Sequence, residues 1–121
     1  KSPLFSVEER VNMLKEATDF IPNCSVQAFS GLLVDFARKT DTHVIVRGLR
    51  AVTYFEYELQ IAQSNRIVAE EIDTIFLTTN IQYSYLSSSM VKEYASYGTD
   101  VSNFVPANVV PLLKAKYNTE K

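Results

Sequence analysis

Apolar positions recur along the chain at two spacings, one typical of amphipathic helices and the other of short buried strands. The helical spacing predicts helices at residues 7–18, 31–39 and 53–68, from Met90 toward a stop at Gly98, and in the last segment from Val101. Short apolar runs predict strands at 25–29, 43–47 and 74–77. Because helices and strands alternate, we expect an α/β fold in which a parallel sheet carries helices on both faces.

The strand predicted at 43–47 leads into the most informative turn of the sequence. Val44, Ile45 and Val46 are apolar in succession, so we expect this strand to be buried on both faces. The chain should then turn at Gly48, with Arg47 and Arg50 on either side of the turn. The carboxyl ends of strands are where open α/β sheets bind ligands.

Two guanidinium groups at such a turn predict an anion site. Arginine donates in a planar fork that matches phosphate oxygens, so a phosphorylated small molecule is the first candidate ligand. The alternative is that the two arginines are surface residues that pair with nearby carboxylates, of which the sequence offers Asp41, Glu56 and Glu58.

Glu58 lies at the edge of an apolar stripe on the helix predicted at 53–68. That stripe consists of Phe55, Leu59, Ala62 and Arg66. A carboxylate in this position is either partly buried and paired, or placed to accept a hydrogen bond from a ligand, and structural pairing is the favoured interpretation.

Three consecutive serines, Ser87 to Ser89, precede the helix predicted to start near Met90. Serine caps helices, but one residue would suffice as a cap, and the run of three favours a phosphate site at the helix N-terminus. Crossover connections would bring the segments that follow the three strands to one edge of the sheet. Those segments contain Leu33, Arg47 to Arg50, and Tyr83 to Ser89.

Composition narrows the class of protein. The chain has 121 residues, 46% of them hydrophobic and 21% charged, which predicts one globular domain. A net charge of −2 argues against nonspecific nucleic-acid binding. Cys24 is the only cysteine and no long apolar run is present, which fits a cytoplasmic protein without a membrane segment.

Several kinds of site are not supported by the sequence. His43 is the only histidine and precedes its strand, away from the expected site, so we expect a structural or solvent-facing role. One cysteine and one histidine do not make a zinc site. The glycines Gly31, Gly48 and Gly98 are too scattered to form a glycine-rich phosphate loop.

Several phrases of the sequence closely resemble one family, the bacterial phosphopantetheine adenylyltransferases. They are Lys1-Ser2-Pro3-Leu4-Phe5, Ile45-Val46-Arg47-Gly48-Leu49-Arg50-Ala51-Val52, Phe55-Glu56-Tyr57-Glu58 and Leu86-Ser87-Ser88-Ser89-Met90-Val91-Lys92-Glu93. The resemblance covers essentially the whole chain in order. It implies a Rossmann-like nucleotidyltransferase fold, with residues 1–121 as a single nucleotidyltransferase domain.

The resemblance also implies an activity and its partners. The family transfers an adenylyl group reversibly from ATP to 4′-phosphopantetheine, which gives dephospho-CoA and pyrophosphate in coenzyme A biosynthesis. It implies Mg²⁺ as a cofactor, a homohexamer, a cytoplasmic location, CoA as a further ligand, and neither nucleic acid nor a membrane as a partner.

Roles for individual residues follow from the same resemblance. Lys1 and Arg47 would hold the phosphopantetheine phosphate and the reacting phosphates, and Leu33 would line the pantetheine channel. The ATP-binding residues would be Gly48, Leu49, Arg50, Glu58, Tyr83, Ser84, Tyr85, Leu86, Ser87, Ser88 and Ser89.

The sequence departs from the family in one respect. Members begin with a strand and a turn that leads to a Gly-His pair, whose histidine stabilises the transition state, and no Gly-His pair occurs here. We therefore expect that the amino-terminal βαβ portion is missing, that the chain corresponds to roughly the carboxyl-terminal three-quarters of the enzyme, and that it is inactive alone. The alternatives are another small-molecule nucleotidyltransferase, such as a nicotinamide-nucleotide or cytidylyl enzyme, and a non-catalytic nucleotide-binding module.

Overall fold

The computed structural model describes residues 2–117. Within this range the chain divides into two compact units. Residues 29–86 form one of them, the sheet unit, and residues 2–28 and 87–117 form the other, the helical unit. The prediction of a single domain stays a prediction.

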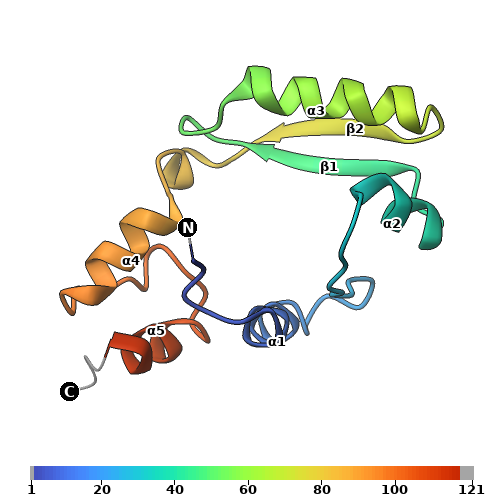
Figure 1. Ribbon diagram of the computed structural model, residues 1–121. Helices are drawn as coiled ribbons and strands as arrows, with labels where there is room; N and C mark the ends of the chain where they lie inside the picture. Colours follow the sequence, from blue (N-terminus) through green and yellow to red (C-terminus); the bar gives the residue numbers. More distant parts are fainter. Residues whose placement is uncertain (1, 118–121) are drawn as a thin grey trace. The chain divides into compact units, whose positions relative to one another are not determined.

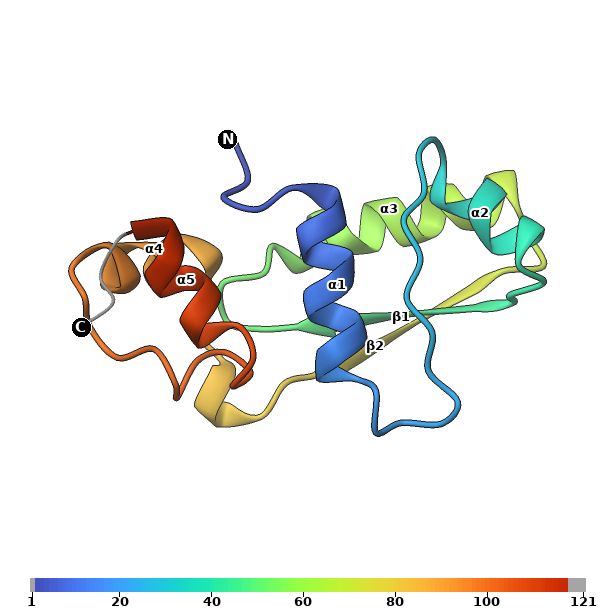
Figure 2. The ribbon, with the colours of Figure 1, turned by 90° about the horizontal axis from the view of Figure 1, so that it is seen from below.

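The sheet unit is built on two parallel strands joined by a helix. Strand β1 (Val44–Leu49) pairs with β2 (Asp73–Thr78), and the register places Val46 opposite Ile75. Helix α3 (Phe55–Val68) connects the strands and runs along them (Figures 1 and 2). The predicted parallel sheet and the helix between its strands are confirmed.

The strand that contains Arg47 is longer than expected. β1 continues through Gly48, which lies opposite Leu77, and the carbonyl of Leu49 still accepts a hydrogen bond from the Thr79 amide at 3.0 Å. The prediction of a turn at Gly48 is therefore wrong, and the chain leaves the strand at Arg50. Glycine is common in turns, but the ladder to β2 extends the strand past it.

The core of the sheet unit lies where α2 (Leu33–Lys39) meets the segment that leads into β2. Val34, Ala37, Ala69 and Ile72 are buried together, and Ile45 of β1 packs against them. Arg38 reinforces this contact, because it donates to both carboxylate oxygens of Glu71 at 2.7 and 3.2 Å and to the Val68 carbonyl at 3.3 Å.

The two faces of the sheet differ. Side chains alternate along a strand, so Ile45 and Phe76 point to the face that α3 covers, where the rings of Phe55 and Phe76 pack edge to face at 5.7 Å. The opposite face carries exposed apolar side chains, namely Val44, Val46, Ile75 and Leu77. The expectation that Val44 and Val46 are buried is wrong, and helices on this second face stay a prediction.

Residues 25–29 do not form the predicted strand. A strand is stabilised by pairing with a neighbour, and within residues 2–117 the only ladder joins β1 and β2. Phe29 instead stacks on Phe36 of α2, with the ring centroids 4.6 Å apart. A partly polar pentapeptide therefore contributes an aromatic contact to the sheet unit and no strand.

The helical unit contains α1 (Val7–Ala17), α4 (Ser88–Ser96) and α5 (Val110–Tyr117), with α4 and α5 in contact. A capping box at Ser6 and Glu9 precedes α1, with both reciprocal hydrogen bonds formed. Lys116 of α5 lies 3.2 Å from the Glu9 carboxylate. The start of α1 is therefore tied to α5.

Candidate active site

Arg47 and Glu58 form the central pair of the site. Arg47 lies in β1 and Glu58 in the first turn of α3, so the strand and the helix that follows it bring together residues eleven positions apart in the chain. Nε of Arg47 donates to Oε1 of Glu58 at 2.8 Å, and Nη2 donates to Oε2 at 3.0 Å. The structural pairing favoured for Glu58 is confirmed.

The pair changes the acidity of both groups. The hydrogen bond to Glu58 raises the pKa of Arg47, and the hydrogen bond from Arg47 lowers the pKa of Glu58. The Glu58 side chain is 13% exposed, whereas that of Arg47 is 49% exposed. The carboxylate is thus largely covered, and half of the arginine faces solvent.

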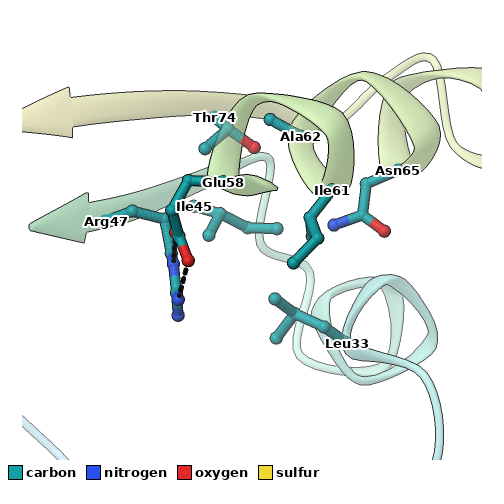
Figure 3. A pocket seen from close by; sticks show the side chains of 8 residues that line it. All are labelled: Leu33, Ile45, Arg47, Glu58, Ile61, Ala62, Asn65 and Thr74. Carbon is teal, nitrogen blue, oxygen red and sulfur yellow. Dashed lines mark hydrogen bonds and ion pairs between the residues drawn. The ribbon is translucent and has the colours of Figure 1, made fainter. Parts of the chain in front are cut away.

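A pocket of about 160 Å³ opens beside this pair (Figure 3). Leu33 of α2 and Ile61 of α3 point toward each other across it. Its walls are mostly apolar, and its lining residues are Leu33, Ile45, Arg47, Glu58, Ile61, Ala62, Asn65 and Thr74. Apolar walls beside a guanidinium suit a largely uncharged group whose anionic end lies near Arg47.

The pocket brings together three residues that the sequence singled out, Leu33, Arg47 and Glu58. Sequence reasoning missed the other lining residues. On α3, however, Glu58, Ile61 and Asn65 follow each other at spacings of three and four, which places them on one helical face. That spacing is the signal that could have found Ile61 and Asn65.

The loop after β1 is held by short-range hydrogen bonds. The Arg50 amide donates to Oγ1 of Thr53 at 3.1 Å, and the Thr53 amide donates back to the Arg50 carbonyl at 2.9 Å. Arg50 itself forms no ion pair within residues 2–117. The alternative of carboxylate pairing therefore holds for Arg47 and not for Arg50.

The segment after β2 approaches the same loop. Ile81–Tyr83 form a short 3₁₀ helix, η1, capped by the Asn80 side chain, which accepts from the Gln82 amide at 3.2 Å. The Ser84 carbonyl then accepts from the Ala51 amide at 2.9 Å. The expectation that the segments after these two strands meet at one edge of the sheet is confirmed for residues 50–53 and 83–84.

The serine run begins the helical unit. Ser87 is the N-cap of α4, because its hydroxyl accepts from the Met90 amide at 3.2 Å, and Ser88 and Ser89 form the first turn. The capping interpretation is confirmed for Ser87. A phosphate site at Ser87 to Ser89 stays a prediction, and Lys1 lies outside the described residues.

His43 lies outside the pocket, as expected. It is exposed and precedes β1, and its carbonyl accepts from the Asp73 amide at 2.9 Å. This backbone hydrogen bond at the start of the β1–β2 pairing gives His43 a structural role.

Magnesium usually binds one or two carboxylates together with substrate phosphates and water. The pocket offers one carboxylate, Glu58, and both of its oxygens accept hydrogen bonds from Arg47. The pocket residues therefore do not form a magnesium site by themselves. Across residues 2–117 no group of three or more His, Cys, Asp or Glu is suitably placed to hold a metal ion.

The helices within residues 2–117 are too short or too polar to cross a bilayer.

Comparisons with known proteins identify the family. A family model described as cytidylyltransferase-like matches residues 1–94. The phosphopantetheine adenylyltransferase of Lachnoclostridium phytofermentans is 57% identical over 121 residues, which is all of this chain and 74% of the relative's length. The chain therefore belongs to the phosphopantetheine adenylyltransferases, within the cytidylyltransferase-like group.

Proposed function

We propose that the protein transfers an adenylyl group reversibly from ATP to 4′-phosphopantetheine and releases dephospho-CoA and pyrophosphate, a step of coenzyme A biosynthesis. The observation that carries this proposal is the 57% identity to a phosphopantetheine adenylyltransferase over the whole chain. The comparison covers the whole chain, so it includes the strand and loop around Arg47, the pocket residues and the serine run.

The geometry of the sheet unit supports the choice of acceptor. 4′-Phosphopantetheine has a phosphate at one end and a long uncharged arm, and the pocket has an arginine at its edge and mostly apolar walls. In the proposed complex the phosphate lies at Arg47, together with Lys1, and the arm extends past Leu33. ATP contacts Gly48, Leu49, Arg50 and the segment from Tyr83 to Ser89.

The reaction needs alignment and charge neutralisation more than proton transfer. An oxygen of the phosphopantetheine phosphate attacks the α-phosphorus of ATP, a new P–O bond forms, and the bond to the β-phosphate oxygen breaks with pyrophosphate as the leaving group. The nucleophile is already ionised, so no general base is required. The guanidinium of Arg47 offsets negative charge while the two anions are held in line.

Three further parts of the proposal rest on the family resemblance. We propose that ATP is used as its magnesium complex, that the protein assembles as a homohexamer, and that it acts in the cytoplasm. Light scattering of the purified protein tests whether it forms a homohexamer. A mass of six subunits supports it, and a stable monomer contradicts it.

The choice between nucleotidyltransferases is tested with paired substrates. The protein is produced as its gene encodes it and incubated with ATP or CTP, each with 4′-phosphopantetheine or nicotinamide mononucleotide as acceptor. Dephospho-CoA formed from ATP and 4′-phosphopantetheine alone supports the proposal. Turnover with CTP or with the nicotinamide acceptor supports a different nucleotidyltransferase, and nucleotide binding by calorimetry without turnover indicates a binding module.

A further inference from the structure

Glu58 accepts hydrogen bonds from one edge of the Arg47 guanidinium, and the other edge is open. A guanidinium has five N–H donors, and the fork to Glu58 uses one on Nε and one on Nη2. Within residues 2–117, Nη1 has no hydrogen-bond partner. Both of its donors and the second one of Nη2 are therefore available to an anion.

We propose that Glu58 is a positioning residue that holds Arg47 in the orientation in which its open edge meets the acceptor phosphate. This inference rests on the proposed function and deepens it. Glu58 then acts through Arg47, and direct contact with ATP is not its main role.

The burial of the pair supports this division of roles. Glu58 is anchored in the first turn of α3 and is 13% exposed, so its carboxylate is a fixed point. Arg47 is 49% exposed and has a long side chain, which loses conformational entropy when its orientation is fixed. A two-point hydrogen bond to a fixed carboxylate restricts that rotation before any substrate binds.

The charge of Glu58 makes the proposal distinguishable from simple anion binding. A carboxylate beside the guanidinium offsets its positive charge, which weakens the attraction for a phosphate in the ground state. Removal of that charge should therefore not weaken phosphate binding, while loss of the fixed orientation should slow the chemical step. Positioning predicts a change in kcat with little change in KM.

The test compares Glu58→Gln with the matched control Glu56→Gln. Glutamine has nearly the same size, but its amide N–H groups face the guanidinium donors, so the fork cannot form. Glu56 lies in the same turn of α3, is exposed, and forms no ion pair within residues 2–117. Both variants are assayed for adenylyl transfer with each substrate varied.

We expect Glu58→Gln to lower kcat by about 10- to 100-fold, as small misplacements of binding groups do, with KM for 4′-phosphopantetheine within about threefold of wild type. Glu56→Gln should leave both constants within about twofold. In an Arg47→Lys background, where no fork can form, Glu58→Gln should have an effect of less than about threefold.

Two kinetic results would overturn the proposal. One is a higher KM for ATP in Glu58→Gln that persists in the Arg47→Lys background, because it would show direct contact between Glu58 and the nucleotide. The other is an unchanged kcat in Glu58→Gln.

A measurement that does not depend on activity separates this inference from the proposed function. In ¹⁵N NMR spectra, a held Arg47 should show an Nε–Hε signal that exchanges slowly with water, and the signal should be lost in Glu58→Gln but kept in Glu56→Gln. A rapidly exchanging signal in the wild type would refute positioning. A protected signal in a protein without adenylyl transfer would refute only the proposed function.

Discussion

The backbone amide of Ala51 donates to the carbonyl of Ser84 at 2.9 Å. This hydrogen bond joins the loop after β1 to the segment after β2. Two of the stretches proposed to hold ATP, Gly48 to Arg50 and Tyr83 to Leu86, are therefore tied together at the carboxyl ends of the strands. The order of the loop should matter for nucleotide binding.

Thr53 is the residue through which this order can be changed. Thr53→Val removes the hydroxyl that accepts from the Arg50 amide at 3.1 Å and keeps the side-chain shape. We expect a loss of about 0.5–1 kcal/mol in unfolding free energy and a KM for ATP raised severalfold. Urea unfolding and steady-state kinetics measure the two effects. Thr53→Ser keeps the hydroxyl and should behave as wild type, and an equal effect of both variants would contradict a role for the hydrogen bond.

Gly48 tests whether the nucleotide approaches the strand backbone. A Cβ at this position would lie 3.9 Å from Cγ2 of Thr79, an ordinary contact, so the fold should tolerate Gly48→Ala. Unfolding free energy should change by no more than about 1 kcal/mol, because alanine costs less entropy than glycine in a strand. If ATP packs against this backbone, its KM should rise. An unchanged KM would remove Gly48 from the ATP-binding residues.

The serine run offers a way to separate capping from phosphate binding. Ser87 caps α4 through the Met90 amide, so Ser87→Ala should lower the unfolding free energy by about 1 kcal/mol. Ser88 is exposed in the first turn, so Ser88→Ala should leave stability unchanged and raise the KM for ATP. Thermal unfolding and kinetics of the two variants give the answer. A Ser88 variant with normal kinetics would leave the run with a capping role alone.

The Arg38–Glu71 pair predicts a pH dependence of stability. The hydrogen bond from Arg38 is the main cause that lowers the pKa of Glu71 to about 2 from an ordinary value of 4.5. A carboxyl with a depressed pKa in the folded state stabilises it at pH values above 4.5, and this contribution is lost as the pH falls toward 2. The difference in stability between wild type and Glu71→Gln should therefore shrink over that range.

Chemical denaturation at a series of pH values measures this difference. Glu70→Gln is the control, since Glu70 is exposed beside Glu71 in the chain and forms no ion pair within residues 2–117. A constant difference between wild type and Glu71→Gln from pH 4.5 down to 2 would contradict the assigned cause.

Features with local signals could be predicted from the sequence. The capping box at Ser6 and Glu9 involves residues three apart, and α1 starts where that spacing indicates. The apolar stripe of α3 that includes Phe55 could also be predicted, because helical spacing alone brings its members to one face. In the structure Phe55 contacts Phe76 of β2.

Features that depend on a distant partner could not be predicted. Gly48 has the local signal of a turn, but pairing with Leu77 keeps it in the strand. Helical spacing in α3 places Phe55 and Leu59 on one face and Glu58, Ile61 and Asn65 on another. Only the position of Leu33 on α2 shows that the face with Ile61 borders a pocket. Pairing of Arg47 with Glu58 was one of the alternatives that the sequence offered, but the choice of Glu58 over Asp41 and Glu56 and the two-point geometry depend on how α3 returns over β1.

The central claim is that Arg47, held at the edge of the sheet unit's pocket, makes adenylyl transfer possible. The most direct test is the rate of dephospho-CoA formation by the wild-type protein and by Arg47→Ala, with circular dichroism as a check that the variant folds. We expect turnover in the wild type and none in a folded Arg47→Ala variant. Equal turnover in the two proteins would remove Arg47 from the site and would contradict a role for its guanidinium in adenylyl transfer.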